Sequence, residues 1–395
     1  MVVLQTARGL LHHGNLGIVR SLGRLGVPVY VFQDVRWAPV AHSRYVRQAF
    51  VGGFQASSAD DTLARLLDVG GRLGGRPILI PTDDAGALFV SEHDAALRQA
   101  FCFPSQPPGL PLRLASKKEL FSLCQQFQVP TPPTAFPRHR ADVLEFVGSS
   151  RFPVVLKCID ARLLEHRPLA RSVFIAQEPG ELLAAYDASE IPGQPNFMLQ
   201  EYIPGGAESI WMFNGYFDAR SECLFGVTGQ KIRQYPPYTG ATSLGICVPN
   251  QAVDDTTRAL MKALGYRGIL DIGYRYDARD GTYKLLDANP RIGATFRLFV
   301  GDNGLDVARA LYLDLTGQRV PASAPRPGRR WVVENRDLVS STHYWRERQL
   351  SLGDFARSLR GVQELAWFAT DDPAPFALMC AVSLAQSLGL HRRTG

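Results

Sequence analysis

The sequence predicts an α/β protein that opens with a parallel, doubly wound sheet. Within the first hundred residues, apolar runs of strand length alternate with helical patterns, which is typical of βαβ units. With 395 residues, the chain exceeds one ordinary hydrophobic core, so we expect two or three domains or one large α/β assembly. Hydrophobic residues make up 46% and charged residues 20%, the composition of a soluble globular protein.

The first elements follow from short apolar runs. Strands are predicted over 2–7 (VVLQTA), over 27–34 (VPVYVFQD) and at the start of 77–93 (PILIPTDDAGALFVSEH), which continues into a polar turn and a helix. Gly14 and Gly17 precede a stretch with helical spacing, but the middle glycine of G-x-G-x-x-G is missing. Asp34 could imitate the ribose-binding acid of that motif, yet the match is too poor to predict a dinucleotide site.

The middle of the chain begins with a linker and continues with mixed elements. Residues 102–111 (CFPSQPPGLP) are rich in proline and are predicted to form the linker. In chain order we then predict helices over 115–128 and 142–149, strands over 152–160 and 171–177, a helix opened by Pro179, a strand over 196–203, an antiparallel pair within 208–235, a helix over 252–265 and a hairpin over 268–291. Arg279, Asp280 and Gly281 supply the hairpin turn.

The last seventy residues follow a proline-rich break at 321–327 and contain one uncharged run, 373–390 (PAPFALMCAVSLAQSLGL). Two prolines open this run, and serine and glutamine interrupt its second half, so it falls short of the roughly twenty apolar residues of a membrane span. We expect a C-terminal helix that docks on the core. Peripheral membrane contact by this segment is the alternative.

The charge pattern limits the partners. The net charge of +6 is modest for this length, and the basic residues are nearly all arginine, because lysine occurs only at 117, 118, 157, 231, 262 and 284. No basic block is interleaved with aromatic residues, so nucleic acid binding is not expected. Six cysteines without C-x-x-C spacing are typical of free thiols, and the N-terminus lacks the pattern of a signal peptide. These features favour a cytoplasmic protein.

The hairpin at 268–291 carries the strongest chemical pattern. Asp287 and Asn289 alternate with apolar residues, so they project from the same face of a strand. Together with Asp271 on the partner strand, they could bind a hard cation such as Mg²⁺. Arg291 would then lie beside the metal as a fixed positive charge for a phosphoryl group or a carboxylate. Alternatively, Asp287 and Asn289 only cap the turn before the next helix, and the spacing leaves both interpretations open.

Other polar residues at strand ends have weaker patterns. Lys157 ends a predicted strand and could contact a phosphate, although such a lysine is more often only solvated. Lys231 and Arg233 together offer positive charge that suits a polyphosphate. The stretch from Glu201 to Glu208 (EYIPGGAE) could present backbone groups to an adenine edge and an acid to a ribose, or it could be no more than a strand and a turn.

Taken together, six stretches in this order resemble the ATP-grasp superfamily, in particular its bacterial carboxylate-amine ligase-like members, which are related to the ATP-binding units of carbamoyl-phosphate synthase. They are SKKEL, VPTPPT, FPVVLK, LQEYIPGG, GQKIRQYPPYTGATSLG and LLDANPRIGA, and they span about residues 115–300. The resemblance implies a parallel-sheet pre-ATP-grasp domain over 1–110, an ATP-grasp domain over 111–320 with a lid at about 150–203, and a partly helical C-terminal extension over 321–395.

The resemblance also assigns roles to individual residues. It implies that ATP is held by Lys117 and Lys157 at the phosphates, by Glu201, Tyr202 and Ile203 at the adenine, and by Glu208 at the ribose. It also implies that Asp287 and Asn289 match the E-x-N metal motif. The residues implied to support catalysis are Lys231, Arg233 and Arg291. Two features depart from the family pattern. Gly273 occupies an expected ligand position, so Asp271 is the substitute metal ligand. The lid loop is long, and Arg171 takes the place of a second lysine.

The activity implied by the resemblance is ATP-dependent ligation. Such enzymes transfer the γ-phosphoryl group of ATP to a carboxylate, and an amine then attacks the acyl phosphate, so catalysis rests on positioning and charge neutralisation. The expected cofactors are ATP and Mg²⁺, with Mn²⁺ as a substitute. The expected partners are a small carboxylate and an amine, with a homodimer left open. The loop over 236–250 is a candidate for specificity, and the competing interpretation is a nucleotide-binding protein without ligase activity.

Overall fold

The computed structural model describes residues 1–7, 9–52, 58–159, 173–191 and 193–388. The chain divides into two compact units. The first comprises Met1–Ala115, Gly206–Gly273 and Ala288–Gly395, and the second comprises Ser116–Gly205 and Tyr274–Asp287. The first unit therefore combines the predicted N-terminal domain with much of the middle of the chain and with the C-terminal extension.

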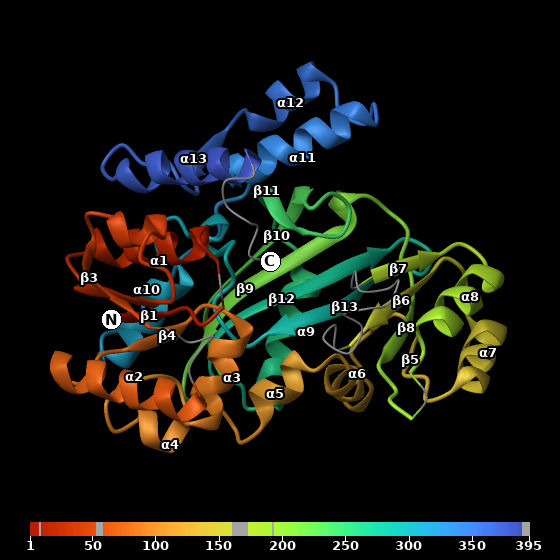
Figure 1. The fold of residues 1–395 in the computed structure, drawn as a ribbon, viewed down its shortest axis with the longest axis horizontal. Coiled ribbons are helices and arrows are strands. Elements are labelled where there is room, and N and C mark those ends of the chain that lie inside the picture. Colours follow the sequence, from red (N-terminus) through yellow and green to blue (C-terminus); the bar gives the residue numbers. More distant parts are fainter. Residues whose placement is uncertain (8, 53–57, 160–172, 192, 389–395) are drawn as a thin grey trace. The chain divides into compact units, whose positions relative to one another are not determined.

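A four-stranded parallel sheet begins the first unit and confirms the predicted α/β start (Figure 1). Its order is β3 (Val46–Val51), β2 (Val29–Gln33), β1 (Val2–Leu4) and β4 (Leu79–Pro81). Alternate residues of β1 enter two different cores, because Val3 packs with α1 (His13–Gly23) whereas Val2 and Leu4 pack with α2 (Ala59–Leu73). Helices therefore cover both faces of this sheet. The strand β3 and the helix α2 were not predicted.

The strand order creates a switch in direction beside β1. From β1 the chain moves outward through β2 to β3, and it then returns to place β4 on the other side of β1. In open parallel sheets, ligands bind outside the carboxyl ends of the strands at such a switch point. The segment after β1 and the turn from β4 into α3 (Asp84–Glu92) lie at that edge. Three further short helices of this region are η1 (Pro39–His42), α4 (Asp94–Leu97) and α5 (Leu110–Ala115).

A seven-stranded sheet has the order β13, β12, β9, β10, β11, β14, β15. The bounds are β9 (Ile210–Phe217), β10 (Cys223–Tyr235), β11 (Ala241–Cys247), β12 (Gly268–Asp277), β13 (Thr282–Asn289), β14 (Arg330–Val332) and β15 (Val362–Leu365). The predicted antiparallel pair is β9 with β10, and the predicted hairpin supplies β12 and β13. The C-terminal extension contributes β14 and β15, which the sequence did not predict. Helical segments in this part of the chain are η3 (Ala207–Ser209), α9 (Gln251–Ala263), η4 (Phe296–Leu298) and α10 (Val307–Leu315).

The rest of the C-terminal extension is helical, with α11 (Glu334–Arg346), α12 (Leu352–Leu359) and α13 (Ala374–Ser387). Met379 of α13 is buried, and Phe376 packs against the main core of the first unit, as expected for a docked helix. Within the described part of the chain, no helix has the length and apolar character needed to cross a membrane.

The second unit contains a four-stranded sheet in the order β5, β8, β6, β7. Its strands are β5 (Thr134–Ala135), β6 (Val154–Cys158), β7 (Val173–Ala176) and β8 (Phe197–Glu201), and its helices are α6 (Lys117–Gln126), α7 (Arg140–Ser149) and α8 (Pro179–Ser189). Every strand pairing is antiparallel. Buried residues from α7, α8 and three of the strands form one core, which fixes β6 and its polar end.

Candidate active site

Two predicted phosphate-binding lysines lie close together in the second unit. Lys157 is on β6, and Lys117 is the first residue of α6, where Ser116 caps the helix. Burial and the neighbouring Lys117 ammonium lower the pKa of Lys157, while the carboxylate of Asp287 counteracts them. Two ammonium groups and one carboxylate therefore act at the same place, which leaves a local excess of positive charge that suits a polyphosphate.

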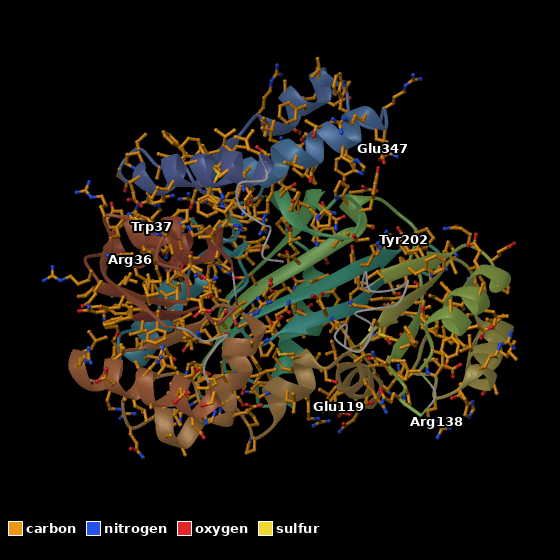
Figure 2. All side chains as sticks on the ribbon, in the orientation of Figure 1. Arg36, Trp37, Glu119, Arg138, Tyr202 and Glu347 are labelled. Carbon is orange, nitrogen blue, oxygen red and sulfur yellow. The ribbon has the colours of Figure 1, made fainter. Side chains whose placement is uncertain are left out.

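The predicted adenine-binding stretch follows β8. The Glu201 carboxylate is buried and accepts a hydrogen bond from the Arg151 backbone N–H at 2.8 Å, so this side chain has a structural role. The backbone N–H groups of Glu201 and Tyr202 donate to the carbonyls of Pro133 and Pro153 at 3.0 and 2.9 Å. The side chain of Tyr202 is labelled in Figure 2. These two donors are already used, which leaves the backbone of Ile203 as the predicted donor to an adenine.

The predicted ribose acid, Glu208, lies on the surface of the first unit. Its carboxylate accepts a hydrogen bond from the Gly206 backbone N–H at 3.0 Å, and its carbonyl accepts from the Gln230 side chain at 2.8 Å. Lys231, the next residue, is half-buried, and its Nζ donates to the carbonyl of Gly240 at 3.0 Å. Glu208 is thus accessible to a hydroxyl ligand and is held in place by its own turn.

Arg233, which the sequence placed among the catalytic residues, lies in the interior. Its side chain is in a buried ion pair with Asp337, with Nε to Oδ1 at 2.9 Å and Nη2 to Oδ2 at 2.6 Å. Nη1 donates to the Ser358 hydroxyl at 2.6 Å, and the guanidinium lies 5.3 Å from the Phe355 ring centre. With only 4% of the residue exposed, this placement argues for a structural role. Ser243 of the proposed specificity loop is also buried and donates to Asp337.

The predicted metal ligands retain the expected arrangement along β13. Asp287 and Asn289 are both half-buried and lie two residues apart on this strand, so they share a face. Neither residue is the N-cap of a helix that follows, because Thr295 is at the N-cap of η4 and Asp306 caps α10. The turn after β13 is instead closed by a backbone bond from Arg291 to the Asn289 carbonyl.

Asp271, the third predicted ligand, is enclosed by the loop after β13. A Cβ atom on Gly293 would lie 2.4 Å from the Asp271 carboxylate, so only glycine permits this close approach. Carboxylate and amide oxygens are the donors that Mg²⁺ takes from proteins, and it usually keeps several water or phosphate ligands. Among the described residues, no three His, Cys, Asp or Glu side chains form a metal-binding group. The donors therefore fit Mg²⁺ held by few protein ligands, and they do not fit an all-protein cage.

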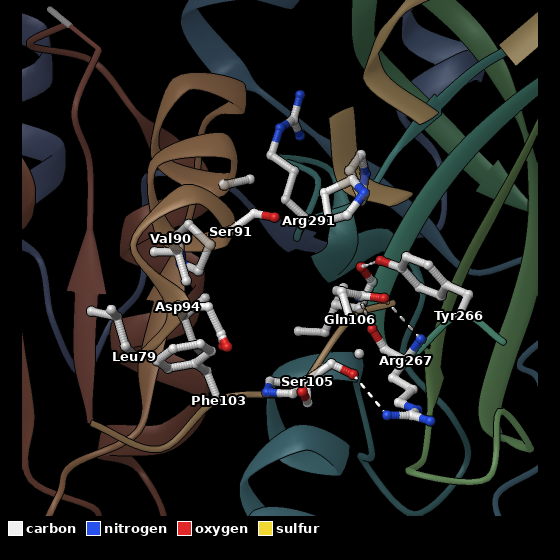
Figure 3. Close-up of a pocket in the computed structure, with 18 of the residues that line it drawn as sticks. Leu79, Val90, Ser91, Asp94, Phe103, Ser105, Gln106, Tyr266, Arg267 and Arg291 are labelled. Atoms are coloured by element: carbon white, nitrogen blue, oxygen red, sulfur yellow. Dashed lines mark hydrogen bonds between the residues drawn. The ribbon is translucent and has the colours of Figure 1, made fainter. Parts of the chain in front are cut away.

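Arg291 reaches the edge of the N-terminal sheet. Its Nε donates to Asp84 at 2.5 Å. Burial alone would lower the pKa of Arg291, but Asp84, Asp271 and Asp83 raise it. The residue also lines a cavity of about 730 Å³ (Figure 3), whose other walls come from β4, α3, the proline-rich segment after Cys102 and residues 266–269. Arg291 is thus a permanently charged group at a ligand-sized cavity of the first unit.

The comparisons with known proteins agree with this architecture. No family model matches the chain. A curated D-aspartate ligase from Enterococcus faecium is 26% identical over 306 residues, which cover 74% of this chain and 72% of the relative. The ADP complex of N5-carboxyaminoimidazole synthetase from Staphylococcus aureus has a TM-score of 0.62 at 11% identity and covers 88% of this chain and 85% of its own. The L-amino acid ligase of Bacillus licheniformis has a TM-score of 0.59 at 15% identity, over 83% and 77% of the two chains.

The chain has an ATP-grasp fold. The predicted fold class is therefore confirmed. One ATP-grasp assignment cannot be followed further, because Arg171 lies outside the described residues. The other departure, Gly273, is on β12 two residues after Asp271.

Two polar residues near the start of the chain were not among the predicted site residues. Asp83 caps α3 and accepts hydrogen bonds from the Thr6 backbone at 2.7 Å and the Thr6 hydroxyl at 2.6 Å. It thus fixes the segment after β1. His12 caps α1, and burial lowers its pKa to about 4, with Arg336 and Arg291 contributing and Asp83 opposing. The only sequence signal was the run of polar residues that follows each strand.

The glycines at 14 and 17 have a packing role in this protein. A Cβ atom on Gly14 would lie 2.8 Å from the Cα atom of Ala294, and one on Gly17 would lie 2.9 Å from the Arg297 side chain. Helix α1 therefore packs directly on the loop that follows β13. Both glycines are needed for this contact. Packing therefore explains the spacing of Gly14 and Gly17, which matches only part of the dinucleotide-binding motif.

Proposed function

We propose that this protein is an ATP-dependent carboxylate-amine ligase, which transfers the γ-phosphoryl group of ATP to a small carboxylate and joins the acyl group to an amine. The observation that carries the proposal is the match to a D-aspartate ligase over most of both chains, on an ATP-grasp fold. The products would be ADP, phosphate and an amide. Since the matched proteins include ligases that act on amino acids, we infer that one substrate of this chain is an amino acid.

The described residues have clear tasks in such a reaction. Lys117 and Lys157 would bind the phosphates, and their paired charge would offset the charge that develops during phosphoryl transfer. The backbone at Ile203 would contact the adenine, and Glu208 would accept hydrogen bonds from the ribose hydroxyls. Arg291 would orient the acid substrate or the transferred group.

Asp287 and Asn289 would hold Mg²⁺, with Asp271 as the further proposed ligand. When it is bound, the ion supplies charge neutralisation at the phosphate oxygens. The protein supplies no covalent nucleophile in this scheme, because the attacking groups come from the substrates. The residues of the chain therefore act by binding, orienting and excluding water.

The proposal is tested with a screen of paired acids and amines for ADP release with ATP and Mg²⁺, in which D-aspartate and L-aspartate are the first acids. The double variant Asp287→Ala with Asn289→Ala should lose at least about 100-fold in turnover while it stays folded, since a carboxylate and an amide ligand are both removed. Asp68→Ala is the matched control, because it removes an exposed carboxylate from α2. ADP formation by the double variant at the wild-type rate would exclude the metal assignment.

A further inference from the structure

The proposed adenine-binding loop of the second unit has few backbone donors to offer. It follows β8 and consists of Tyr202, Ile203, Pro204 and Gly205. The Tyr202 N–H is already bonded to the Pro153 carbonyl, and proline has no N–H. Gly205 has a φ of 128°, a backbone angle that glycine adopts readily. The conformation of this short loop therefore decides where the backbone N–H of Ile203 points.

Arg275 of β12 binds this loop on both sides of Ile203. Its Nη2 donates to the Gly205 carbonyl at 2.6 Å and to the Tyr202 hydroxyl at 3.2 Å. Its guanidinium also lies over the Tyr202 ring, 4.8 Å from the ring centre, which is within the range of a cation–π contact. One side chain thus joins the residue before Ile203 to the second residue after it.

The charge of Arg275 is not used in an ion pair. The residue is only 8% exposed, its Nε is buried without a hydrogen-bond partner, and none of the carboxylates that the structure describes is paired with it. Arg279, in the same unit, instead pairs with Asp277 at 2.7 Å. A buried charge without a counter-ion costs free energy of folding. The described side-chain bonds of Arg275 all go to the loop, so the order of that loop is what this side chain provides.

Other contacts attach the end of β8 to the hairpin independently. The Nη2 of Arg279 lies 3.7 Å from the Glu201 carboxylate and 2.7 Å from that of Asp277. Lys284 donates to the same Asp277 carboxylate at 2.7 Å. None of these contacts involves Arg275. The hairpin should therefore stay attached to β8 when Arg275 is replaced, and only the loop after Glu201 should lose its support.

Arg275 also shares a face of β12 with a proposed metal ligand. Residues 271, 273 and 275 alternate along this strand, so Arg275 projects from the same face as Asp271. At about 3.3 Å per residue, the two positions are about 13 Å apart along the strand. This face of β12 therefore carries a proposed ligand of the metal at one position and the support of the adenine loop at another.

We propose that Arg275 is a positioning residue for ATP, which holds the loop so that the Ile203 backbone meets the adenine and which thereby sets the preference for adenine over guanine. This inference rests on the proposed ATP-dependent function. Adenine has a hydrogen-bond acceptor at N1, which a backbone N–H can meet, whereas guanine has a donor there. A fixed N–H rejects guanine because two donors would face each other, and a loop that moves loses this discrimination.

The test measures the binding of ATP, GTP and inorganic tripolyphosphate by calorimetry, with Mg²⁺ and without an acid substrate. Arg275→Gln should raise the Kd for ATP about 10-fold or more, because the loop no longer presents the Ile203 backbone. The Kd for tripolyphosphate should not change, since Lys117 and Lys157 remain. The Kd for GTP, divided by that for ATP, should therefore fall by about the same 10-fold factor.

Two further variants complete the comparison. Arg275→Lys keeps the charge but loses the planar group that lies over the Tyr202 ring, so its Kd for ATP should lie between those of the wild type and Arg275→Gln. It replaces Arg275→Gln if that variant does not fold. Arg140→Gln is the control, because it removes an exposed arginine of the same unit that pairs with Asp187. Its Kd values for all three ligands should equal those of the wild type.

The outcomes separate this inference from the ligase proposal. An unchanged ATP affinity in folded Arg275→Gln or Arg275→Lys would overturn the positioning role, even if the protein is a ligase. An equal loss of affinity for ATP and for tripolyphosphate would also overturn it, because Arg275 would then act on the phosphates or on the whole unit. Arg275-dependent binding of ATP by a protein that never releases ADP would support the positioning role and reject the ligase function. A wild-type protein that binds neither ATP nor GTP would overturn both.

Discussion

The ion pair between Arg233 and Asp337 gives the sharpest prediction about the C-terminal extension. Asp337 is 2% exposed, and it accepts two bonds from Arg233, at 2.9 and 2.6 Å, and one from the Ser243 hydroxyl at 2.9 Å. Asp337→Ala leaves a buried guanidinium without its counter-ion and an unpaired hydroxyl. Breaking a buried pair in this way costs about 3–5 kcal/mol. We therefore expect Asp337→Ala to lower the free energy of unfolding by about that amount.

The measurement is urea unfolding followed by circular dichroism, with the double variant Arg233→Met, Asp337→Leu as the comparison. Replacing both partners with apolar residues of similar volume is often close to neutral, so the double variant should lie within about 1 kcal/mol of the wild type. It should also keep its ligase activity, since Arg233 contributes to stability alone in this interpretation. An unchanged free energy of unfolding in Asp337→Ala would refute the reasoning. Lost activity in a stable double variant would return Arg233 to the catalytic set.

Two further predictions concern the lysine pair and the histidines. Lys157→Ala should weaken ATP binding about 10-fold or more, measured by calorimetry. Lys118→Ala is the control, because it removes an exposed lysine nearby on the chain. Equal ATP affinities of Lys157→Ala and the wild type would contradict the phosphate assignment. Because the folded pKa of His12 is about 4, below its ordinary value near 6.5, its contribution to stability is present above pH 6.5 and is lost as pH falls toward 4. His12→Asn keeps a capping acceptor and should reduce this acid loss by up to about 2 kcal/mol between unfolding experiments at pH 7.5 and pH 5. An identical loss in the variant would exclude His12 as its source.

Local patterns predicted a large part of the fold because they depend on neighbouring residues. The alternation within β13 placed Asp287 and Asn289 on one face, and the structure has the same strand and register of faces. The apolar runs likewise predicted β1, β2 and β4 of the parallel sheet. In contrast, β3 has no fully buried residue, so its sequence lacks the apolar run by which the other strands were recognised.

Long-range pairing accounts for what the sequence did not reveal. Arg233 resembled a catalytic residue because Lys231 is near it in sequence, whereas its partner Asp337 is 104 residues away. Gly14 and Gly17 resembled part of a phosphate motif because the contacts with Ala294 and Arg297 cannot be read from spacing. The C-terminal extension had no recognised motif, and only the folded chain brings its strands β14 and β15 to the edge of the seven-stranded sheet beside β11.

The position of Arg336 depends on the buried pair beside it. Asp337 is the next residue of α11, and its bonds to Arg233 attach this helix to β10. Arg336 itself lies near Tyr235, two residues after Arg233 on the same strand. In this arrangement, the buried ion pair attaches the C-terminal extension to β10 and so fixes the start of α11, where the Arg336 guanidinium lies 5.8 Å from the ring centre of Tyr235.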